Sequence, residues 1–346
     1  MAKLKIALIP GDGIGREVVP EARKVVDALG LDLAWTELPW GSQYFRETGR
    51  MMPLRGLEIL AQHDAALLGA VGEPGVPDHE TLWGLLLPIR QGLDLWANLR
   101  PVRFLPGISG PLTGRGPDDV DMIFVRENTE GEYAGVGGRA HVGLPHEIGV
   151  EVSVFTRSTI ERLARFSFEL ARSRRGRLIS ATKSNAARYG YVLWDEVIEE
   201  VAADYPSVEL ERVLVDALAA RMVTNPGSLD VVVSSNLFGD ILTDVGAAIQ
   251  GGMGMAASAN VAPGADAPGV FEPVHGSAPD IAGQGVANPI GAIWSAALML
   301  EHLGERAASE QVLAAVARVV LAGPRTRDLG GVADTAEVGD AVTDAL

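Results

Sequence analysis

Short apolar runs alternate with longer stretches of helical spacing along the whole chain, and this alternation constrains the fold more than any other feature. The short runs are rich in Val, Ile and Leu and lie at residues 5–9, 65–69, 121–125, 177–181, 213–215 and 230–234. The longer stretches lie at residues 17–29, 156–172, 191–205, 289–303 and 310–321. Such alternation predicts an α/β fold in which helices cover a largely parallel sheet.

The composition excludes several classes of protein. The 346 residues predict about two domains. A formal net charge of −16 repels phosphate backbones and anionic lipids, so we expect neither nucleic acid nor a membrane as partner. The absence of Cys excludes disulfides and thiolate chemistry. The first apolar run is too short for a signal peptide, so a cytoplasmic location is expected.

Irregular segments show where loops are expected. Residues 100–116 and 256–268 are rich in Pro and Gly, and we interpret them as loops and crossings. Residues 131–151 are polar and Gly-rich, with alternation only at the end. We expect this segment to form a hairpin arm that reaches a neighbouring subunit.

A glycine-rich turn, Pro10-Gly11-Asp12-Gly13-Ile14-Gly15, follows the first strand and opens a helix. A dinucleotide loop would occupy this place, but the Rossmann fingerprint requires Gly where Arg16 stands. A tight strand-to-helix turn is the alternative interpretation.

Two carboxylates are predicted to share one helix face. Asp240 and Asp244 are four residues apart and follow an apolar strand. Carboxylates that close repel each other, and a divalent cation with oxygen ligands would relieve the repulsion. Helix capping by Asp240 and a solvated Asp244 are the alternative.

Basic and phenolic side chains are candidates for an anion site and for proton transfer. Arg90, Arg100 and Arg126 lie near segment ends, and guanidinium groups bind carboxylates bidentately. Lys183 directly follows a strand, where loss of solvent can lower its pKa, and Tyr133 lies beyond Arg126. Surface salt bridges and a solvated Lys are the alternatives.

Together these motifs resemble the β-decarboxylating dehydrogenases, which include isocitrate, 3-isopropylmalate, homoisocitrate and tartrate/D-malate dehydrogenases. The resemblance covers essentially the whole chain. It rests on Ile-Pro-Gly-Asp-Gly-Ile-Gly at 9–15, Ala-Asn-Leu-Arg-Pro at 97–101, Val-Arg-Glu-Asn-Thr-Glu-Gly at 125–131, Asn-Leu-Phe-Gly-Asp-Ile-Leu at 236–242 and Phe-Glu-Pro-Val-His-Gly-Ser-Ala-Pro-Asp-Ile-Ala-Gly at 271–283.

The resemblance implies an isopropylmalate dehydrogenase-like two-domain fold with a largely parallel sheet, not a Rossmann fold. Residues 1–98 plus 251–346 would form the larger domain with most NAD contacts. Residues 99–250 would form the smaller domain with the metal ligands, the dimer interface and the arm. A homodimer with shared active sites, or a higher oligomer, is expected.

Residue roles follow from the same resemblance. Arg90, Arg100 and Arg126 would bind the carboxylates of a malate-like substrate. Asp240 and Asp244, with the partner's Asp216, would hold Mg²⁺ or Mn²⁺. Lys183, supplied by the partner subunit, would take the proton of the substrate hydroxyl, and Tyr133 would protonate the enol carbon after loss of CO₂.

The expected cofactor is NAD. In the family, an Asp at the position of Asp280 accepts a hydrogen bond from the ribose 2′-hydroxyl, whereas NADP enzymes carry Lys followed by Tyr. Here Asp280 precedes Ile281. The other expected cofactor contacts are His275, Gly276, Ser277, Ala278 and Asn288.

The expected substrate depends on the segment before Arg90. Trp83, Leu86 and Leu87 would form an apolar wall, where a third carboxylate would remain unpaired at a cost of several kcal/mol. The segment 82–84 resembles tartrate/D-malate enzymes, which usually carry Ser at the position of Leu85. D-malate or tartrate is expected, with 3-isopropylmalate and then isocitrate or homoisocitrate as alternatives.

Two other classes remain open. The chain could be a non-catalytic regulatory subunit, although such subunits typically lose the catalytic residues that are present here. It could also be a metal-dependent decarboxylase without redox chemistry, but the segment around Asp280 would then have no purpose.

Overall fold

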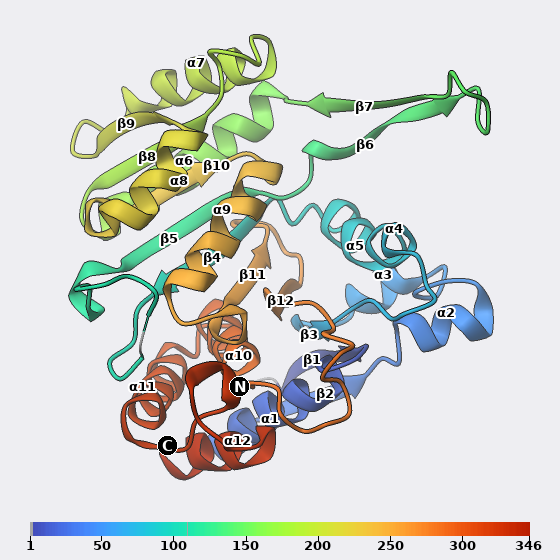
Figure 1. Cartoon of the computed structure of the whole chain (residues 1–346), viewed down its shortest axis with the longest axis vertical. Helices are drawn as coiled ribbons and strands as arrows, with labels where there is room; N and C mark the ends of the chain where they lie inside the picture. Colours follow the sequence, from blue (N-terminus) through green and yellow to red (C-terminus); the bar gives the residue numbers. More distant parts are fainter. Residues whose placement is uncertain (1–2, 109) are drawn as a thin grey trace.

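A mixed sheet of ten strands forms the centre of the molecule, in the order β2-β1-β3-β12-β11-β4-β5-β10-β8-β9 (Figure 1). The computed structural model describes residues 3–108 and 110–346. The strands of the sheet are β1 (Leu4–Gly11), β2 (Leu33–Glu37), β3 (Ala65–Ala70), β4 (Ala97–Arg103), β5 (Asp121–Glu127), β8 (Arg177–Thr182), β9 (Glu209–Leu214), β10 (Val231–Ser234), β11 (Ala257–Val261) and β12 (Gly269–Pro273).

Most neighbouring strands run parallel, as predicted. The exceptions lie at the centre, where β11 is antiparallel to both β12 and β4, and β4 is antiparallel to β5. The predicted run 213–215 was wrong in its position. Strand β9 ends at Leu214, and helix α8 begins at the next residue. As an edge strand, β9 carries exposed Glu209 and Glu211, so it is not a continuous apolar run.

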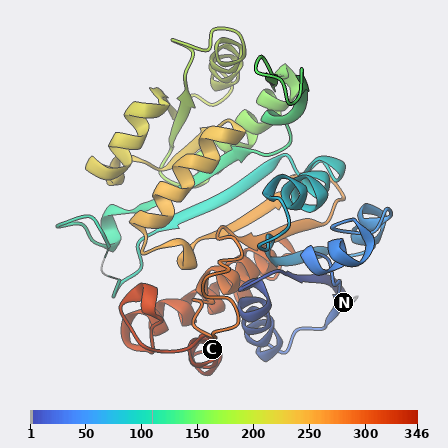
Figure 2. The same cartoon turned by 45° about the vertical axis from the view of Figure 1, so that its right-hand side comes forward.

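Helices cover the sheet on both faces. They are α1 (Gly15–Ala28), α2 (Ser42–Thr48), α3 (Gly56–Leu60), α4 (Asp78–Thr81), α5 (Leu87–Gly92), α6 (Arg157–Ser173), α7 (Gly190–Ala202), α8 (Val215–Thr224), α9 (Asn236–Ile249), α10 (Ile290–His302), α11 (Arg306–Ala322) and α12 (Thr335–Asp344). A π-helical turn, η1 (Leu82–Leu86), joins α4 to α5. Helix α10 is almost wholly buried, and it lies with α1, α11 and α12 on one side of the sheet (Figure 2).

The two halves of the sheet come from different parts of the sequence. The predicted larger domain contributes β2, β1, β3, β12 and β11. The predicted smaller domain contributes β5, β10, β8 and β9. Strand β4 begins at Ala97 and pairs with a strand of each half. Because one sheet runs through both halves, the boundaries 1–98, 99–250 and 251–346 stay a prediction.

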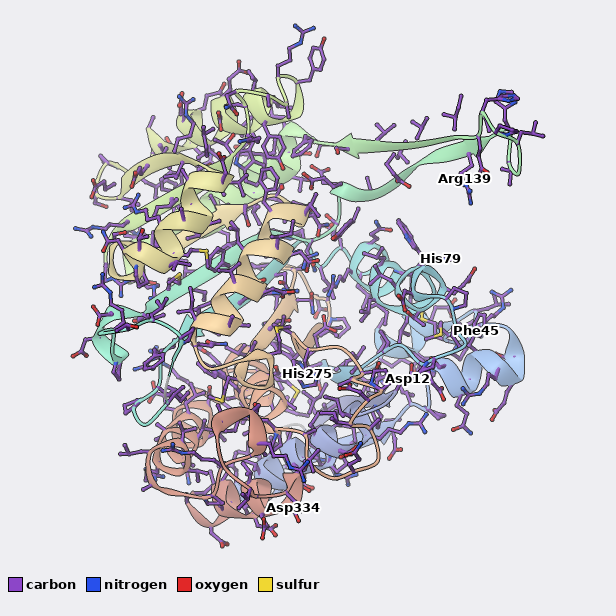
Figure 3. All side chains as sticks on the ribbon, viewed as in Figure 1. Asp12, Phe45, His79, Arg139, His275 and Asp334 are labelled. Atoms are coloured by element: carbon purple, nitrogen blue, oxygen red, sulfur yellow. The ribbon has the colours of Figure 1, made fainter. Side chains whose placement is uncertain are left out.

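The expected hairpin arm is present. Strands β6 (Gly131–Ala140) and β7 (Ile148–Val154) form a separate antiparallel sheet that projects from the body (Figure 1). Arg139 lies on this projection, far from His275 in the body (Figure 3). The side chains of Val150 and Val152 on the arm are exposed. Contact of the arm with a neighbouring subunit remains a prediction.

The segment 256–268, predicted as loop, contains strand β11, and the segment 100–116 begins with the end of β4. Two polar residues of β11, Ser258 and Asn260, interrupt the apolar pattern that identifies a buried strand, yet both are fully buried. Among the described residues, no helix is long and apolar enough to cross a membrane.

Candidate active site

A cavity of about 180 Å³ lies between the two halves of the sheet, where the antiparallel strands meet. Its walls come from β3, η1, α5, β4, β5, β6, α9, β11 and β12, so residues far apart in sequence converge on it. The lining includes Leu82, Leu86, Leu87, Arg90, Arg100, Arg126, Tyr133, Asp240, Glu272, His275 and Gly276. The structure therefore brings together the three predicted arginines, Tyr133 and Asp240.

The three arginines are buried and held by side chains from neighbouring elements. Arg90 Nη2 donates to Glu272 Oε1 at 2.8 Å. Arg100 Nε donates to Asn98 Oδ1 at 2.8 Å, and its Nη1 donates to Thr243 Oγ1 at 2.7 Å. Among the described residues, the buried Nε of Arg90 has no hydrogen-bond partner. A buried donor without a partner at a cavity suits an anionic ligand.

Arg126, at the end of β5, is bound to the first turns of α9. Its Nε and Nη2 donate to Asn236 Oδ1 at 3.0 and 2.7 Å, and its Nη1 donates to Asp240 Oδ1. Gly239 leaves room for this arginine, because a Cβ atom there would lie 2.6 Å from both Cβ and Cγ of Arg126.

A row of hydrogen-bonded, buried amide and carboxylate side chains joins two of these arginines, and we call it the buried ladder. The sequence did not predict it. Asn260 Nδ2 donates to Glu272 Oε1 at 2.9 Å, and Asn260 Oδ1 accepts from Asn98 Nδ2 at 2.9 Å. The ladder thus runs from Arg90 through Glu272, Asn260 and Asn98 to Arg100, across β12, β11 and β4. The available signal was the presence of Asn and Glu inside otherwise apolar strands.

Charge and burial set the protonation of the acidic groups. Burial raises the pKa of Asp240, but Arg126, Arg100 and Arg90 outweigh it, so the net pKa lies below the usual range. Tyr133 donates its hydroxyl to Asp240 Oδ2 at 3.1 Å. Burial and the Asp240 charge raise the pKa of Tyr133. The phenol therefore keeps its proton at neutral pH.

Asp240 and Asp244 fit part of a divalent metal site. Both lie on α9, and burial together with the Asp240 charge raises the pKa of Asp244. A hard cation with oxygen ligands would relieve that repulsion. Within residues 3–108 and 110–346, no group of three or more His, Asp or Glu could hold a metal ion. A complete site would need oxygen donors from outside the chain.

Lys183 and Asp216 are not brought to this cavity by the fold of one chain. They pair with each other, with Lys183 Nζ donating to Asp216 Oδ1 at 2.6 Å. This contact lowers the pKa of Asp216. Lys183 directly follows β8, and Asp216 lies in the first turn of α8, just after β9, which is the parallel neighbour of β8.

His275 and Gly276 line the cavity and begin the predicted cofactor segment. Burial lowers the pKa of His275, so the imidazole is neutral at pH 7. Its buried Nε2 has no hydrogen-bond partner within the described part of the chain. Asp280 is exposed, and a Cβ atom on Gly276 would meet no described atom within 4 Å. The segment thus offers a nitrogen of His275 for hydrogen bonding, open space beside Gly276 and the exposed carboxylate of Asp280. These features fit an extended polar cofactor such as a dinucleotide.

The glycine-rich turn supports this segment instead of forming a Rossmann loop. Ile14 N donates to Ser277 O at 2.9 Å, and a Cβ atom on Gly13 would lie 2.0 Å from that same oxygen. Glycine at 13, with φ of 51°, therefore permits the close approach. The buried carboxylate of Asp12 accepts from Ser42 N at 2.9 Å, which fixes the turn.

The remaining cofactor candidates are differently placed. Ala278 adopts a positive φ of 41° next to Ser277. Ile281 packs partly buried against the core. Asn288 is engaged within the chain, because its Nδ2 donates to Asp328 Oδ2 at 2.9 Å and its Oδ1 accepts from Ile290 N at 3.0 Å.

The apolar wall differs from the expected one in one member. Leu86 and Leu87 line the cavity, and Leu82 joins them. Trp83 instead packs against the base of the arm, since a Cβ atom on Gly135 would lie 2.5 Å from Cη2 of Trp83. Leu82 was not expected in the wall, because the larger side chain of Trp83 was assigned there.

Residues 5–342 match the isocitrate/isopropylmalate dehydrogenase family. The chain belongs to this family. Its members are decarboxylating dehydrogenases, and the chain is such an enzyme. A probable tartrate dehydrogenase/decarboxylase of Agrobacterium vitis is 50% identical, with 100% of this chain and 97% of the relative covered. A decarboxylating D-malate dehydrogenase of Escherichia coli is 48% identical, over 99% of this chain and 98% of the relative.

A 3-isopropylmalate dehydrogenase of Thermobifida fusca is 50% identical, over 97% of this chain and 96% of that family member. The crystal structure of isocitrate dehydrogenase from Methylococcus capsulatus superposes with a TM-score of 0.91, at 36% identity and 99% coverage of both chains. The predicted family and fold class are thereby confirmed.

Proposed function

We propose that the enzyme catalyses NAD- and divalent-metal-dependent oxidative decarboxylation of a small 2-hydroxy dicarboxylate, D-malate or tartrate. The observation that carries the proposal is the cavity in which Arg90, Arg100 and Arg126 converge beside Tyr133 and Asp240. Three guanidinium groups in one small space suit an anion with more than one carboxylate. A tyrosine next to them supplies an acid where the product forms.

The arginines would bind and orient the substrate. Each is fixed by fully or largely buried partners, so little side-chain freedom is lost on binding. Arg90, whose Nε has no partner among the described residues, lines the cavity, and Arg100 and Arg126 enter it from the adjacent strands β4 and β5. Their burial excludes water and strengthens their attraction for carboxylates.

Tyr133 would deliver the proton that completes the reaction. Loss of CO₂ from a 2-keto acid with a β-carboxylate would leave an enolate, whose carbon must be protonated. The raised pKa keeps the Tyr133 hydroxyl protonated, and Asp240 orients it through the 3.1 Å contact.

Two absent groups would complete the chemistry. Asp240 and Asp244 would hold Mg²⁺ or Mn²⁺, whose charge would stabilise the negative charge that develops during decarboxylation, and NAD⁺ beside residues 275–281 would accept the hydride. His275 Nε2 and Asp280 are the groups of this chain available to orient the cofactor. Asn288 would act only through the loop that it holds, because both ends of its amide are engaged.

The active site would be shared between two copies of the chain in a homodimer. Lys183, just after β8, and Asp216, in the first turn of α8, form a pair in one chain, outside the cavity that holds Tyr133 and Asp240. Supplied to a partner, this pair would add the base that takes the hydroxyl proton and a third carboxylate for the metal. A homodimer would therefore be the smallest active unit.

The substrate wall favours a dicarboxylate with a small or apolar group on C3. Leu82, Leu86 and Leu87 offer no partner to a third carboxylate, which disfavours isocitrate and homoisocitrate. The same leucines would also contact an isopropyl group, and Trp83 lies against Gly135 instead of narrowing this wall. This observation favours 3-isopropylmalate as the second candidate.

A panel of five hydroxy acids tests the proposal. Initial rates with D-malate, L-tartrate, 3-isopropylmalate, isocitrate and homoisocitrate, each with NAD⁺ or NADP⁺ and with Mg²⁺ or Mn²⁺, would give kcat/KM for each combination. We expect D-malate with NAD⁺ to rank first and isocitrate to rank among the poorest. A clear preference for 3-isopropylmalate would select the second candidate, and turnover without a nicotinamide cofactor would refute the redox step.

A further inference from the structure

We infer that Glu132 is a positioning residue, whose carboxylate fastens β6 to α9 and so sets the contact between Tyr133 and Asp240. The inference rests on the proposed function, in which this pair delivers a proton. Glu132 precedes Tyr133 on β6, and Asp240 lies in the second turn of α9. The two elements come from distant parts of the sequence, so their spacing needs a specific connection.

Both oxygens of Glu132 are engaged at the start of α9. Its Oε2 accepts from Leu237 N at 3.1 Å, and its Oε1 accepts from Ser235 Oγ at 3.2 Å. Ser235 is also the N-cap of the helix. A carboxylate at this place satisfies a free amide and interacts favourably with the helix dipole.

A third donor comes from α7. Tyr191 Oη donates to Glu132 Oε1 at 2.5 Å, and its ring stacks on Phe238 of α9 with centroids 4.7 Å apart. Tyr191 is buried, and burial together with Glu132 raises the pKa of its hydroxyl. The phenol thus remains a donor over the physiological range, and Glu132 is fixed from two helices at once.

The geometry links these contacts to the proton-delivering pair. Leu237 and Asp240 are three residues apart and therefore lie on the same side of α9. Glu132 and Tyr133 are adjacent, so a displacement of the Glu132 backbone moves Tyr133 with it. Arg90 is held by Glu272 of β12, and Arg100 Nε by Asn98 of β4, so two of the three arginines keep an anchor that the Glu132 contacts do not touch.

Glu132→Gln is the decisive variant. The amide keeps the size of the side chain but retains only one acceptor oxygen, so it loses either the Leu237 contact or the Ser235 and Tyr191 contacts. We expect kcat to fall about 10- to 100-fold, because misplacement of a catalytic group by about 1 Å can lower the rate about 100-fold. KM for the hydroxy acid should change much less than kcat, because Arg90 and Arg100 keep their anchors on β12 and β4.

Hydrogen exchange, together with the separation of kcat from KM, distinguishes positioning from simple loss of structure. In the free Glu132→Gln protein the Leu237 amide should exchange faster, because it has lost its acceptor. Glu130→Gln is the matched control, because the Glu130 carboxylate binds Thr156 at the start of α6 and not α9. It should leave kcat and Leu237 exchange as in the wild type.

Tyr191→Phe provides a second test if Glu132→Gln fails to fold. The ring stack is retained and one donor is lost, so the same changes should appear with smaller amplitude. Tyr189→Phe, at an exposed position on the same segment, is its control. Faster Leu237 exchange with unchanged kcat would overturn the inference, and so would a rise in KM as large as the fall in kcat. Absence of wild-type turnover on every hydroxy acid would instead refute the proposed function.

Discussion

Replacement of Gly239 by Ala should push Arg126 out of position and thereby weaken dicarboxylate binding. The new Cβ atom would lie 2.6 Å from Cβ and Cγ of Arg126 and 2.8 Å from Ser234 Oγ. Such overpacking costs about 1–3 kcal/mol, and the helix propensity of Ala returns about 1 kcal/mol. The net loss in the free energy of unfolding should therefore be about 0–2 kcal/mol.

The effect on binding should be larger than the effect on folding. A hydrogen bond between charged groups contributes about 1.5–3 kcal/mol, so a displaced Arg126 should raise KM for the hydroxy acid roughly 10- to 100-fold. Gly246→Ala is a matched control on the same helix, because its Cβ atom would lie 2.6 Å from Cγ2 of Val102 in the core. It should cost similar stability and leave KM unchanged.

Urea unfolding and steady-state kinetics on both variants would check this reasoning. The prediction fails if Gly239→Ala is destabilised but binds the substrate normally, since Arg126 would then not contact it. It also fails if Gly246→Ala raises KM to the same extent, because the effect would then reflect a general disturbance of α9.

Other predictions concern protonation, cofactor choice and site sharing. Burial raises the pKa of Glu127 from 4.5 to about 7, so the folded chain holds a proton that the unfolded chain has released between these values. The proton held by Glu127 stabilises the folded chain fully below pH 4.5, and this stabilisation is lost as pH rises through 7. Glu127→Gln should therefore reduce the pH-dependent change in the free energy of unfolding by about 3 kcal/mol. Parallel plots of the free energy of unfolding against pH for the variant and the wild type would contradict this. NAD⁺ should exceed NADP⁺ in kcat/KM, and Asp280→Lys with Ile281→Tyr should narrow or invert the ratio; a wild type that prefers NADP⁺ would show that Asp280 does not select the cofactor. Inactive Lys183→Met and Asp240→Asn chains should regain up to half of wild-type activity per heterodimer when mixed, whereas no recovery despite subunit exchange would mean that each chain builds its own site.

The sequence predicted the strands whose side chains serve only to pack in the core. The apolar runs of β1, β3, β5, β8 and β10 were identified because burial on both faces of a parallel strand requires uninterrupted apolar residues. Strand β11 was not, because Asn260 serves the buried ladder and breaks that pattern. The prediction of a loop over residues 256–268 was therefore wrong for residues 257–261, which form β11 and contribute Ser258 to the cavity.

The site was predictable to a similar extent. Charged groups such as Arg126 and Asp240 are conspicuous in sequence, and their convergence followed from the resemblance to a family. The residues that hold these charged groups in place were not predictable, since Glu272 and Glu132 bind residues far away in the sequence. The orientation of the Trp83 side chain could not be predicted either, because it depends on a contact with Gly135 in the arm.

The arginine cluster also makes the stability of the protein depend on its ligand. Burial lowers the pKa of Arg100 to about 9, and the like charge of Arg126 adds to this effect. The two cations repel each other in the free protein. A dianion that enters the cavity relieves this repulsion and binds only the folded chain. At a concentration of about 100 times Kd it would add about 2.7 kcal/mol to the free energy of unfolding. Thermal melting with candidate acids can therefore rank ligands of this enzyme without any turnover, even for acids that bind but do not react.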